Sequence, residues 1–147
     1  MGETRVSRSI AAPVHTVFEV VAHIDRFREA IPHIVDVAYL SDETRGVGTR
    51  FRETRLMGKR RATTELECTE YEPPNRVRMV SDAGGAVWDT VFTVTEEDEG
   101  CRLEMVMDAR PHSLFAKITV PLFGRMVTKA VEADMDAVKA HCEAAAD

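Results

Sequence analysis

The sequence predicts an α+β fold: an antiparallel sheet of about seven strands, two short helices after the first strand and one long helix at the end of the chain. Over most of residues 34–107 apolar and polar side chains alternate, which is typical of strands with one buried face. The segments between these runs are short, so neighbouring strands form hairpins, whereas a parallel sheet needs a long crossover after each strand. From residue 122 apolar residues recur at steps of three and four, which indicates a helix that packs on one face of the sheet.

The first residues predict a strand and two short helices. The strand covers residues 4–11 and ends before Pro13, which suits the first turn of a helix because its missing N–H needs no partner there. Asp25 is the expected N-cap of a second helix over residues 26–30, and Pro32 ends that helix. The apolar face of the first helix consists of Val14, Val17, Phe18 and Val21.

Strand alternation also predicts which side chains face the interior of the sheet. They are Phe51, Glu53, Arg55, Met57, Ala62, Thr64, Leu66, Cys68, Val77, Met79, Ala86, Trp88, Thr90, Phe92, Val94, Cys101, Leu103, Met105 and Met107. In the C-terminal third, Ser113 is expected to cap a helix and Pro121 to interrupt it. The apolar stripe of the long helix is expected to consist of Phe123, Val127, Val131, Met135, Val138 and Cys142.

Length and composition limit the class of protein. A chain of 147 residues, 44% of them hydrophobic, predicts a single domain over residues 1–147 whose core needs neither a disulfide nor a metal. The net charge of −6 excludes a general nucleic-acid-binding protein, whose surface is net basic. No apolar run reaches the length of a membrane span and the first nine residues are too polar for a signal peptide, so we expect a cytoplasmic protein. Cys68, Cys101 and Cys142 are expected to be reduced thiols.

Basic residues are concentrated in one segment. Residues 45–61 hold seven basic residues and one acid, a charge of +6, so the rest of the chain carries −12. A basic hairpin of this kind favours an anionic ligand or an acidic protein partner. The alternative is an ordinary surface hairpin whose arginines pair with glutamates of neighbouring strands.

Signatures of several enzyme classes are missing from the sequence. It contains no nucleophile elbow, no P-loop and no dinucleotide-binding fingerprint. The histidines and cysteines fall in no zinc-ligand spacing, so we expect no metal and no cofactor. His15, Glu19 and His23 lie one helical turn apart, and we expect them to be ordinary solvated side chains.

Two charged residues interrupt the expected inner face of the sheet. Glu53 and Arg55 alternate in phase with Phe51, so both point toward the interior if the alternation holds. A buried charge must be paired or hydrated, which predicts a polar spot inside an apolar interior. The alternative is that the strand ends or bulges there and that both side chains reach solvent.

Four segments resemble motifs of a known family: IAAPVHTVFEVV (residues 10–21), GVGTRF (46–51), YEPPNRV (71–77) and WDTVFTV (88–94). Together they resemble the START-like ligand-binding superfamily, also called SRPBCC or helix-grip, and within it the polyketide cyclase/dehydrase branch. The resemblance covers residues 3–142. It implies a curved sheet that grips a long C-terminal helix across its concave face, with a hydrophobic cavity between them for lipids, polyketides or similar molecules.

The cavity implied by this resemblance takes its lining from the expected inner face. The candidate lining residues are Phe51, Glu53, Arg55, Met79, Trp88, Phe92, Met105 and Met107, with Leu122 and Met126 from the helix. A lipid carboxylate is expected to bind near Arg55, because a guanidinium offers a two-pronged contact. No active-site motif of the family is matched, so Glu53 is the one candidate catalytic residue.

Three functions are consistent with the sequence. The first is binding of a small hydrophobic or amphipathic molecule without catalysis. The second is a cyclase/dehydrase-type enzyme with Glu53 as general base and Arg55 stabilising an enolate or carboxylate. The third is a protein-interaction module that uses the basic hairpin at residues 45–61. The identity of the ligand and the oligomeric state are not predicted.

Overall fold

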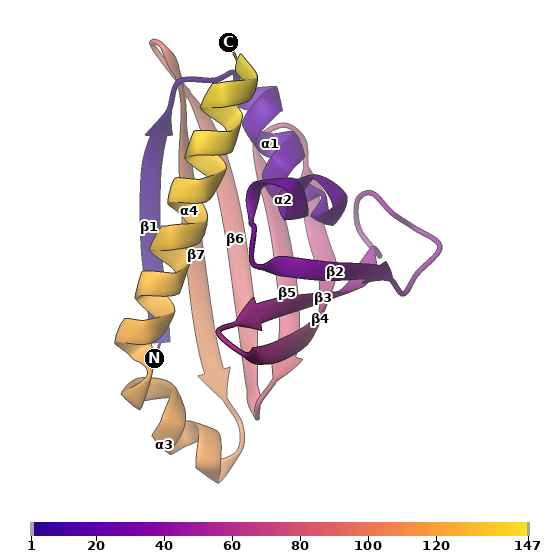
Figure 1. The fold of residues 1–147 in the computed structure, drawn as a ribbon, viewed down its shortest axis with the longest axis vertical. Coiled ribbons are helices and arrows are strands. Elements are labelled where there is room, and N and C mark those ends of the chain that lie inside the picture. Colours follow the sequence, from indigo (N-terminus) through magenta and orange to yellow (C-terminus); the bar gives the residue numbers. More distant parts are fainter. Residues whose placement is uncertain (1, 147) are drawn as a thin grey trace.

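The computed structural model describes residues 2–146, whose arrangement is shown in Figure 1. The strands are β1 (Gly2–Ile10), β2 (Ile34–Tyr39), β3 (Arg50–Met57), β4 (Arg60–Glu72), β5 (Arg76–Ala83), β6 (Ala86–Glu97) and β7 (Gly100–Pro111). The helices are α1 (Val14–Ala22), α2 (Ile24–Ala30), α3 (Leu114–Leu122) and α4 (Gly124–Ala146). This order of elements confirms the predicted α+β class.

The seven strands form one antiparallel sheet in the order β1-β7-β6-β5-β4-β3-β2. Strands β2 to β7 are consecutive neighbours, and β1 returns to the sheet edge beside β7. The register places residues of the predicted inner face opposite one another, for example Phe92 opposite Met105 and Cys68 opposite Met79. The sheet therefore presents one continuous apolar face to the helices.

Helix α4 runs along this face of the sheet beside β1, while α1 and α2 pack next to α4, with α1 over β5, β6 and β7 (Figure 1). The α4 side chains Val131, Met135, Val138 and Cys142 are at most 6% exposed, as their spacing predicts. This arrangement is the helix-grip fold that the resemblance implies.

The two short helices begin at other residues than the sequence predicts, α1 one residue later and α2 two residues earlier. α1 begins at Val14, so Pro13 is its N-cap residue and not part of the first turn. α2 begins at Ile24, with His23 and not Asp25 at the N-cap position. Asp25 instead lies in the first turn, where a carboxylate is favourable at the positive end of the helix dipole, and it pairs with Arg45 at 3.0 Å.

A proline divides the C-terminal helical region. Ser113 Oγ accepts a hydrogen bond from the N–H of Ala116 at 3.0 Å, so the predicted cap is present. Pro121 lies in the last turn of α3, and its missing N–H stops the helical hydrogen bonding. Phe123 then separates α3 from α4 and is 49% exposed. The predicted stripe is therefore wrong at Phe123 and begins only at Val127.

His23 is 3% exposed, so the expectation that it is solvated is wrong. Its Nε2 lies 2.9 Å from the hydroxyl of Tyr71, and its Nδ1 lies 2.7 Å from a carboxylate oxygen of Glu19. The side chain turns inward because it sits at the junction of α1 and α2, against the ring of Phe18. Burial, reinforced by the charge of Arg45, lowers the pKa of His23, which favours the neutral ring.

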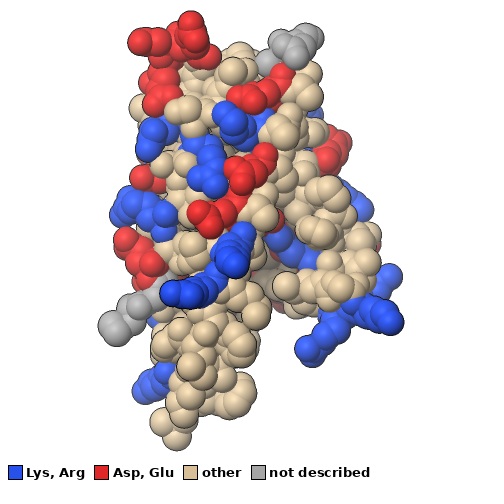
Figure 2. Space-filling view, turned by 60° about the vertical axis from the view of Figure 1, so that its left-hand side comes forward, with Lys and Arg blue, Asp and Glu red and all other residues tan. Residues whose placement is uncertain are grey.

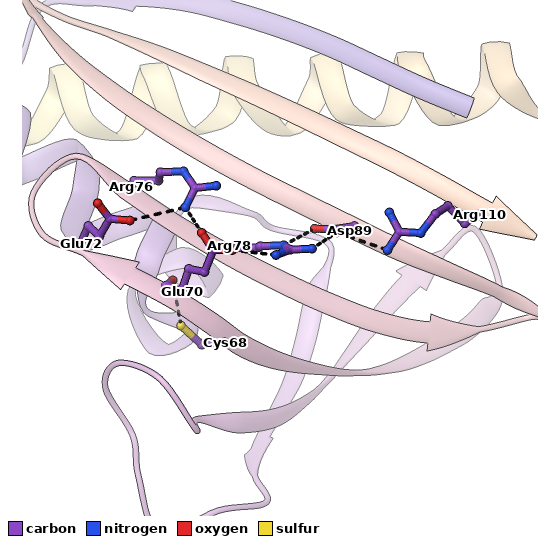
Figure 3. Close-up of polar contacts among 7 residues, drawn as sticks. All are labelled: Cys68, Glu70, Glu72, Arg76, Arg78, Asp89 and Arg110. Carbon is purple, nitrogen blue, oxygen red and sulfur yellow. Dashed lines mark hydrogen bonds and ion pairs between the residues drawn. The ribbon is translucent and has the colours of Figure 1, made fainter. Parts of the chain in front are cut away.

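The outer face of the sheet carries a ladder of ion pairs across β4, β5, β6 and β7 (Figure 3). Arg78 donates to Glu70 at 2.6 Å and through Nε to Asp89 at 2.8 Å. Arg110 reaches the same Asp89 carboxylate at 3.3 Å, and Arg76 also pairs with Glu70. The hydrogen bond from Arg78 is the main cause that lowers the pKa of Asp89. Charged residues on this face leave the opposite face free for apolar packing.

Candidate functional site

A cavity of about 520 Å³ lies between the inner face of the sheet and α4. Its volume is within the range of pockets for small molecules, roughly 300–1,000 Å³. Strands β3 to β7 and helices α1, α2 and α4 all contribute to the lining. Apolar lining residues include Phe51, Leu66, Met79, Trp88, Phe92, Met105, Met107, Val127, Val131 and Met135.

The cavity is closed at one end and open at the other. Val21, Ile24 and Val138 line the closed end and are at most 5% exposed. Met57 at the end of β3, Gly84 in the β5–β6 turn and Ala130 in α4 also line the cavity, and all three are exposed. The entrance therefore lies between the β3–β4 turn, the β5–β6 turn and the first turns of α4.

One cluster of charged side chains interrupts the apolar wall. Arg55 donates through Nε to Glu53 at 2.9 Å and through Nη1 to both carboxylate oxygens of Asp134 at 2.9 and 3.1 Å. The side chains of Arg55, Asp134 and Glu53 are 24, 20 and 12% exposed. Strand alternation places Glu53 and Arg55 on the same face as Phe51, and both line the cavity instead of reaching outward to solvent.

The cluster contains two carboxylates and one guanidinium. Burial raises the pKa of Asp134, and the charge of Arg55 opposes this effect only in part. The guanidinium is already engaged by carboxylates through Nε and Nη1 without a ligand, and the cluster as a whole holds one more carboxylate than cation. The cluster therefore offers acceptor oxygens to the cavity more readily than it offers a cation.

Ser81 is a further polar residue of the lining. It is 4% exposed, and its hydroxyl has no hydrogen-bond partner among residues 2–146. A buried hydroxyl without a partner is uncommon and is costly in an apolar environment. Trp88, its cross-strand neighbour, is satisfied, because its indole N–H donates to the carbonyl of Ala83 at 3.1 Å.

The structure places eight of the ten candidate lining residues at the cavity: Phe51, Glu53, Arg55, Met79, Trp88, Phe92, Met105 and Met107. Leu122 and Met126 lie outside the lining and are 73 and 60% exposed. Both flank the break after Pro121, where the chain has not yet joined the inward face of α4. The helix contributes Val127, Ala130, Val131 and Asp134 to the cavity in their place.

Asp134, the partner of Arg55, was not among the residues predicted from the sequence. A signal was present, since Asp134 lies three residues after Val131 and four before Val138, on the apolar side of the helix. An acidic residue at such a position has to find a buried partner. That spacing does not predict which residue of the sheet Asp134 pairs with, because Arg55 lies far away in the sequence.

The basic residues of the segment 45–61 do not share one environment in the structure. Arg45 pairs with Asp25, and Arg55 lies in the cavity wall. The remaining members, Arg50, Arg52, Lys59, Arg60 and Arg61, form no ion pair within the described part of the chain. The alternative in which these arginines pair with glutamates of neighbouring strands is wrong, because Arg55 pairs with Glu53 of its own strand and with Asp134 of α4.

Residues 2–146 include no cluster of three side chains able to hold a metal ion. Within the same residues, no helix is both long enough and apolar enough to cross a membrane.

The sequence model of a family described as polyketide cyclase / dehydrase and lipid transport matches residues 1–143. The chain belongs to this family. The match confirms the resemblance to the START-like superfamily and its polyketide cyclase/dehydrase branch. The description of the family supports a ligand-binding family. No curated protein is similar enough in sequence to match the chain.

Solved structures of similar fold include TTHA0849 from Thermus thermophilus, with a TM-score of 0.79, 20% identity and 99% of both chains covered. A START superfamily protein from Mycobacterium smegmatis has a TM-score of 0.78 at 11% identity, with 96% of this chain and 97% of that chain covered. The di-domain ARO/CYC StfQ from the steffimycin biosynthetic pathway has a TM-score of 0.81 at 13% identity. The match covers 99% of this chain but 51% of StfQ, so this chain spans about half of that protein. At these identities the likeness shows the fold alone.

Proposed function

We propose that this protein encloses one small amphipathic molecule, lipid-like or polyketide-like, between the sheet and α4 and releases it unchanged. The observation that carries the proposal is a cavity of about 520 Å³ whose wall is apolar except for a few polar groups. Ligand pockets of this kind bind through apolar contact and take their orientation from a small number of polar groups. The family description, which includes lipid transport, supports the same reading.

The charged cluster favours a neutral hydrogen-bond donor at the polar end of the ligand. Arg55 is already engaged by Glu53 and Asp134, and a ligand carboxylate would meet two negative groups for one positive group. A hydroxyl can instead donate to a carboxylate oxygen at no electrostatic cost. We therefore expect alcohols and phenols to bind better than fatty acids, the reverse of the expectation from Arg55 alone.

The partnerless hydroxyl of Ser81 supports a ligand with a second polar atom. It belongs to β5, whereas the charged cluster belongs to β3 and α4. A carbonyl or hydroxyl group at this point of the ligand would satisfy Ser81. A molecule with oxygens at two separated positions fits the lining better than a plain hydrocarbon chain with one head group.

Cyclase/dehydrase-type catalysis is the second candidate function. It is favoured by a carboxyl group inside an apolar cavity, Asp134, whose pKa burial raises, because a carboxylate with a raised pKa is a stronger proton acceptor. In this candidate Asp134, and not Glu53 as expected from the sequence, would be the proton acceptor. The two functions differ in one observable: a carrier returns its ligand chemically unchanged, whereas an enzyme returns a product, which chromatography separates from the ligand even where ring closure leaves the mass the same.

The test is a titration of the protein with dodecanol and dodecanoic acid at pH 7, followed by the emission of Trp88, the only tryptophan, which lines the cavity. We expect saturable binding of dodecanol and at least tenfold weaker binding of dodecanoate. Asp134→Asn removes one negative charge from the cluster and should narrow this difference. Asp136→Asn is the matched control, since Asp136 lies on the same helix but is 62% exposed and pairs with Arg8.

Two results would contradict the proposal. If neither compound binds with saturation, the cavity does not accept amphipathic ligands of this type. If Asp134→Asn and Asp136→Asn change the alcohol-to-acid preference equally, the charged cluster does not recognise the polar end. Recovery of a product that chromatography separates from the ligand would favour the enzyme over the carrier.

A further inference from the structure

Helix α3 exposes an apolar face to solvent. Four large apolar side chains lie on one side of the helix, as their spacing requires, and all are exposed: Leu114 (81%), Phe115 (75%), Ile118 (66%) and Leu122 (73%). Ala116 is the buried residue of α3 and fastens the helix against the β5–β6 turn near Gly85. Soluble proteins rarely expose large contiguous apolar patches unless those patches contact something.

The same kind of surface continues around the entrance of the cavity. Leu56 and Met57 at the end of β3 are 40 and 56% exposed, and Met57 also lines the cavity. Phe123 and Met126, after α3, are 49 and 60% exposed. We call these eight residues the entrance surface: Leu56, Met57, Leu114, Phe115, Ile118, Leu122, Phe123 and Met126.

Basic residues accompany the entrance surface, although the chain as a whole has a net charge of −6. Residues 56–64 contain Lys59, Arg60 and Arg61 and no acid, and residues 113–131 contain Lys117, Arg125 and Lys129 and no acid. None of these six side chains forms an ion pair within residues 2–146. In Figure 2 the lower end, where α3 lies, is tan without acidic residues, whereas acidic residues gather at the upper end.

We propose that the entrance surface docks on an anionic lipid bilayer. Exposed apolar side chains of a helix enter the boundary between head groups and acyl chains, and lysines and arginines beside them bind anionic head groups. A second copy of the chain fits less well, because a symmetric contact would bring the six basic residues of one copy against those of the other. Charge and hydrophobicity thus point to the same occupant.

Docking in this orientation places the mouth of the cavity on the bilayer. The mouth lies between Met57, Gly84 and Ala130, directly among the residues of the entrance surface. A lipid-like ligand could then enter or leave without its apolar part crossing water. The inference goes beyond the proposed function, and the docking itself needs no ligand in the cavity.

The test is co-sedimentation of the protein with vesicles of phosphatidylcholine alone and of phosphatidylcholine with an equal part of phosphatidylglycerol. We expect binding to the anionic vesicles that weakens as salt is added, and much weaker binding to the neutral ones. Phe115→Ser with Ile118→Ser should abolish binding to both, because it removes the inserted side chains. Lys59→Glu with Arg60→Glu should weaken binding to anionic vesicles more than tenfold, since each basic residue near an anionic surface contributes measurably.

Val47→Ser is the matched control, because Val47 is also 60% exposed but lies in the β2–β3 loop, outside the entrance surface. It should bind vesicles like the wild type. The proposal is overturned if the wild type ignores anionic vesicles, or if the Phe115/Ile118 variant binds them as well as Val47→Ser does. It is also overturned if these two apolar substitutions instead dissolve a dimer, which would make a second copy the occupant. Vesicle binding is measured without ligand, so its failure is separate from a failure of the cavity to bind dodecanol.

Discussion

Asp134 on α4 and Arg55 on β3 are joined by two hydrogen bonds of 2.9 and 3.1 Å inside the cavity wall. This contact ties α4 to β3. Together with Glu53 it engages the guanidinium within the protein, and the carboxylate oxygens of the pair remain acceptors for a ligand.

Replacing Arg55 should destabilise the protein in a pH-dependent way. Arg55→Met leaves Glu53 and Asp134 without their cation, which should lower the free energy of unfolding by about 1–3 kcal/mol at pH 7. The loss should shrink toward pH 5, because a carboxyl whose pKa is raised by burial takes up a proton and loses its unpaired charge. Urea unfolding at both pH values measures this difference.

Arg52→Met is the control for that experiment. Arg52 lies on the opposite face of β3 from Arg55 and forms no ion pair in residues 2–146. Its replacement should therefore change the free energy of unfolding by no more than about 0.5 kcal/mol. Equal effects of Arg52→Met and Arg55→Met would mean that the cluster contributes nothing specific to stability.

Replacing Met135 with alanine should destabilise the protein, whereas the same replacement of Met126 on the same helix should not. Met135 is 1% exposed, whereas Met126 is 60% exposed. Met135→Ala should lower the free energy of unfolding by about 2–5 kcal/mol, as truncation of a buried large side chain does. Met126→Ala should leave it within about 0.5 kcal/mol of the wild type. Similar melting temperatures for both variants would show that α4 does not pack on the sheet through Met135.

The periodic spacing of apolar residues predicted most of the fold but only part of the cavity lining. Alternation with period two predicted that Phe51, Glu53 and Arg55 share one face, and the structure agrees. The helical pattern failed where Pro121 ends α3, because a period cannot be continued across a break in the hydrogen-bond ladder. For that reason Leu122 and Met126 were expected in the cavity and lie outside it.

Long-range pairing was beyond the reach of the sequence patterns. Arg55 and Asp134 meet only because α4 crosses the sheet in one particular position, and side-chain spacing within each element does not encode that position. His23 is a similar case, since its burial depends on Tyr71, which a distant strand supplies. Local periodicity says which face a residue occupies, whereas tertiary packing decides what it meets.

The three cysteines should be unreactive in the folded protein. Burial raises the pKa of Cys68 and of Cys142 to about 11, and it also raises the pKa of Cys101. At pH 8 about one thiol in a thousand would then be ionised at Cys68 and Cys142, and thiolate is the reactive form. Ellman's reagent should release almost no colour from native protein and three equivalents after denaturation. Rapid reaction of one native thiol would contradict the buried environments described above.

The free energy of unfolding should fall as the pH drops below about 6.5, which is the pKa of an ordinary, solvent-exposed histidine side chain. Burial lowers the pKa of His23 in the folded protein. The unfolded chain therefore binds a proton at a higher pH than the folded protein does, and this binding stabilises the unfolded chain. The carboxylates with lowered pKa, Asp25, Asp89 and Asp136, start from 3.8 and act at lower pH. His23→Gln should therefore flatten the free energy of unfolding between pH 7 and pH 5.5. An unchanged slope in that variant would assign the acid sensitivity to other groups.

Methionine methyl groups offer the most direct test of the ligand cavity. Met57, Met79, Met105, Met107 and Met135 line it, whereas Met126 lies outside and serves as an internal control. With isotope-labelled methionine methyls, NMR spectra recorded during a dodecanol titration should show saturable shifts and ligand contacts at Met79, Met105 and Met107. Met126 should show neither. Contacts at Met126 alone, or no saturable change at the cavity methionines, would contradict the conclusion that the space between sheet and helix binds the ligand.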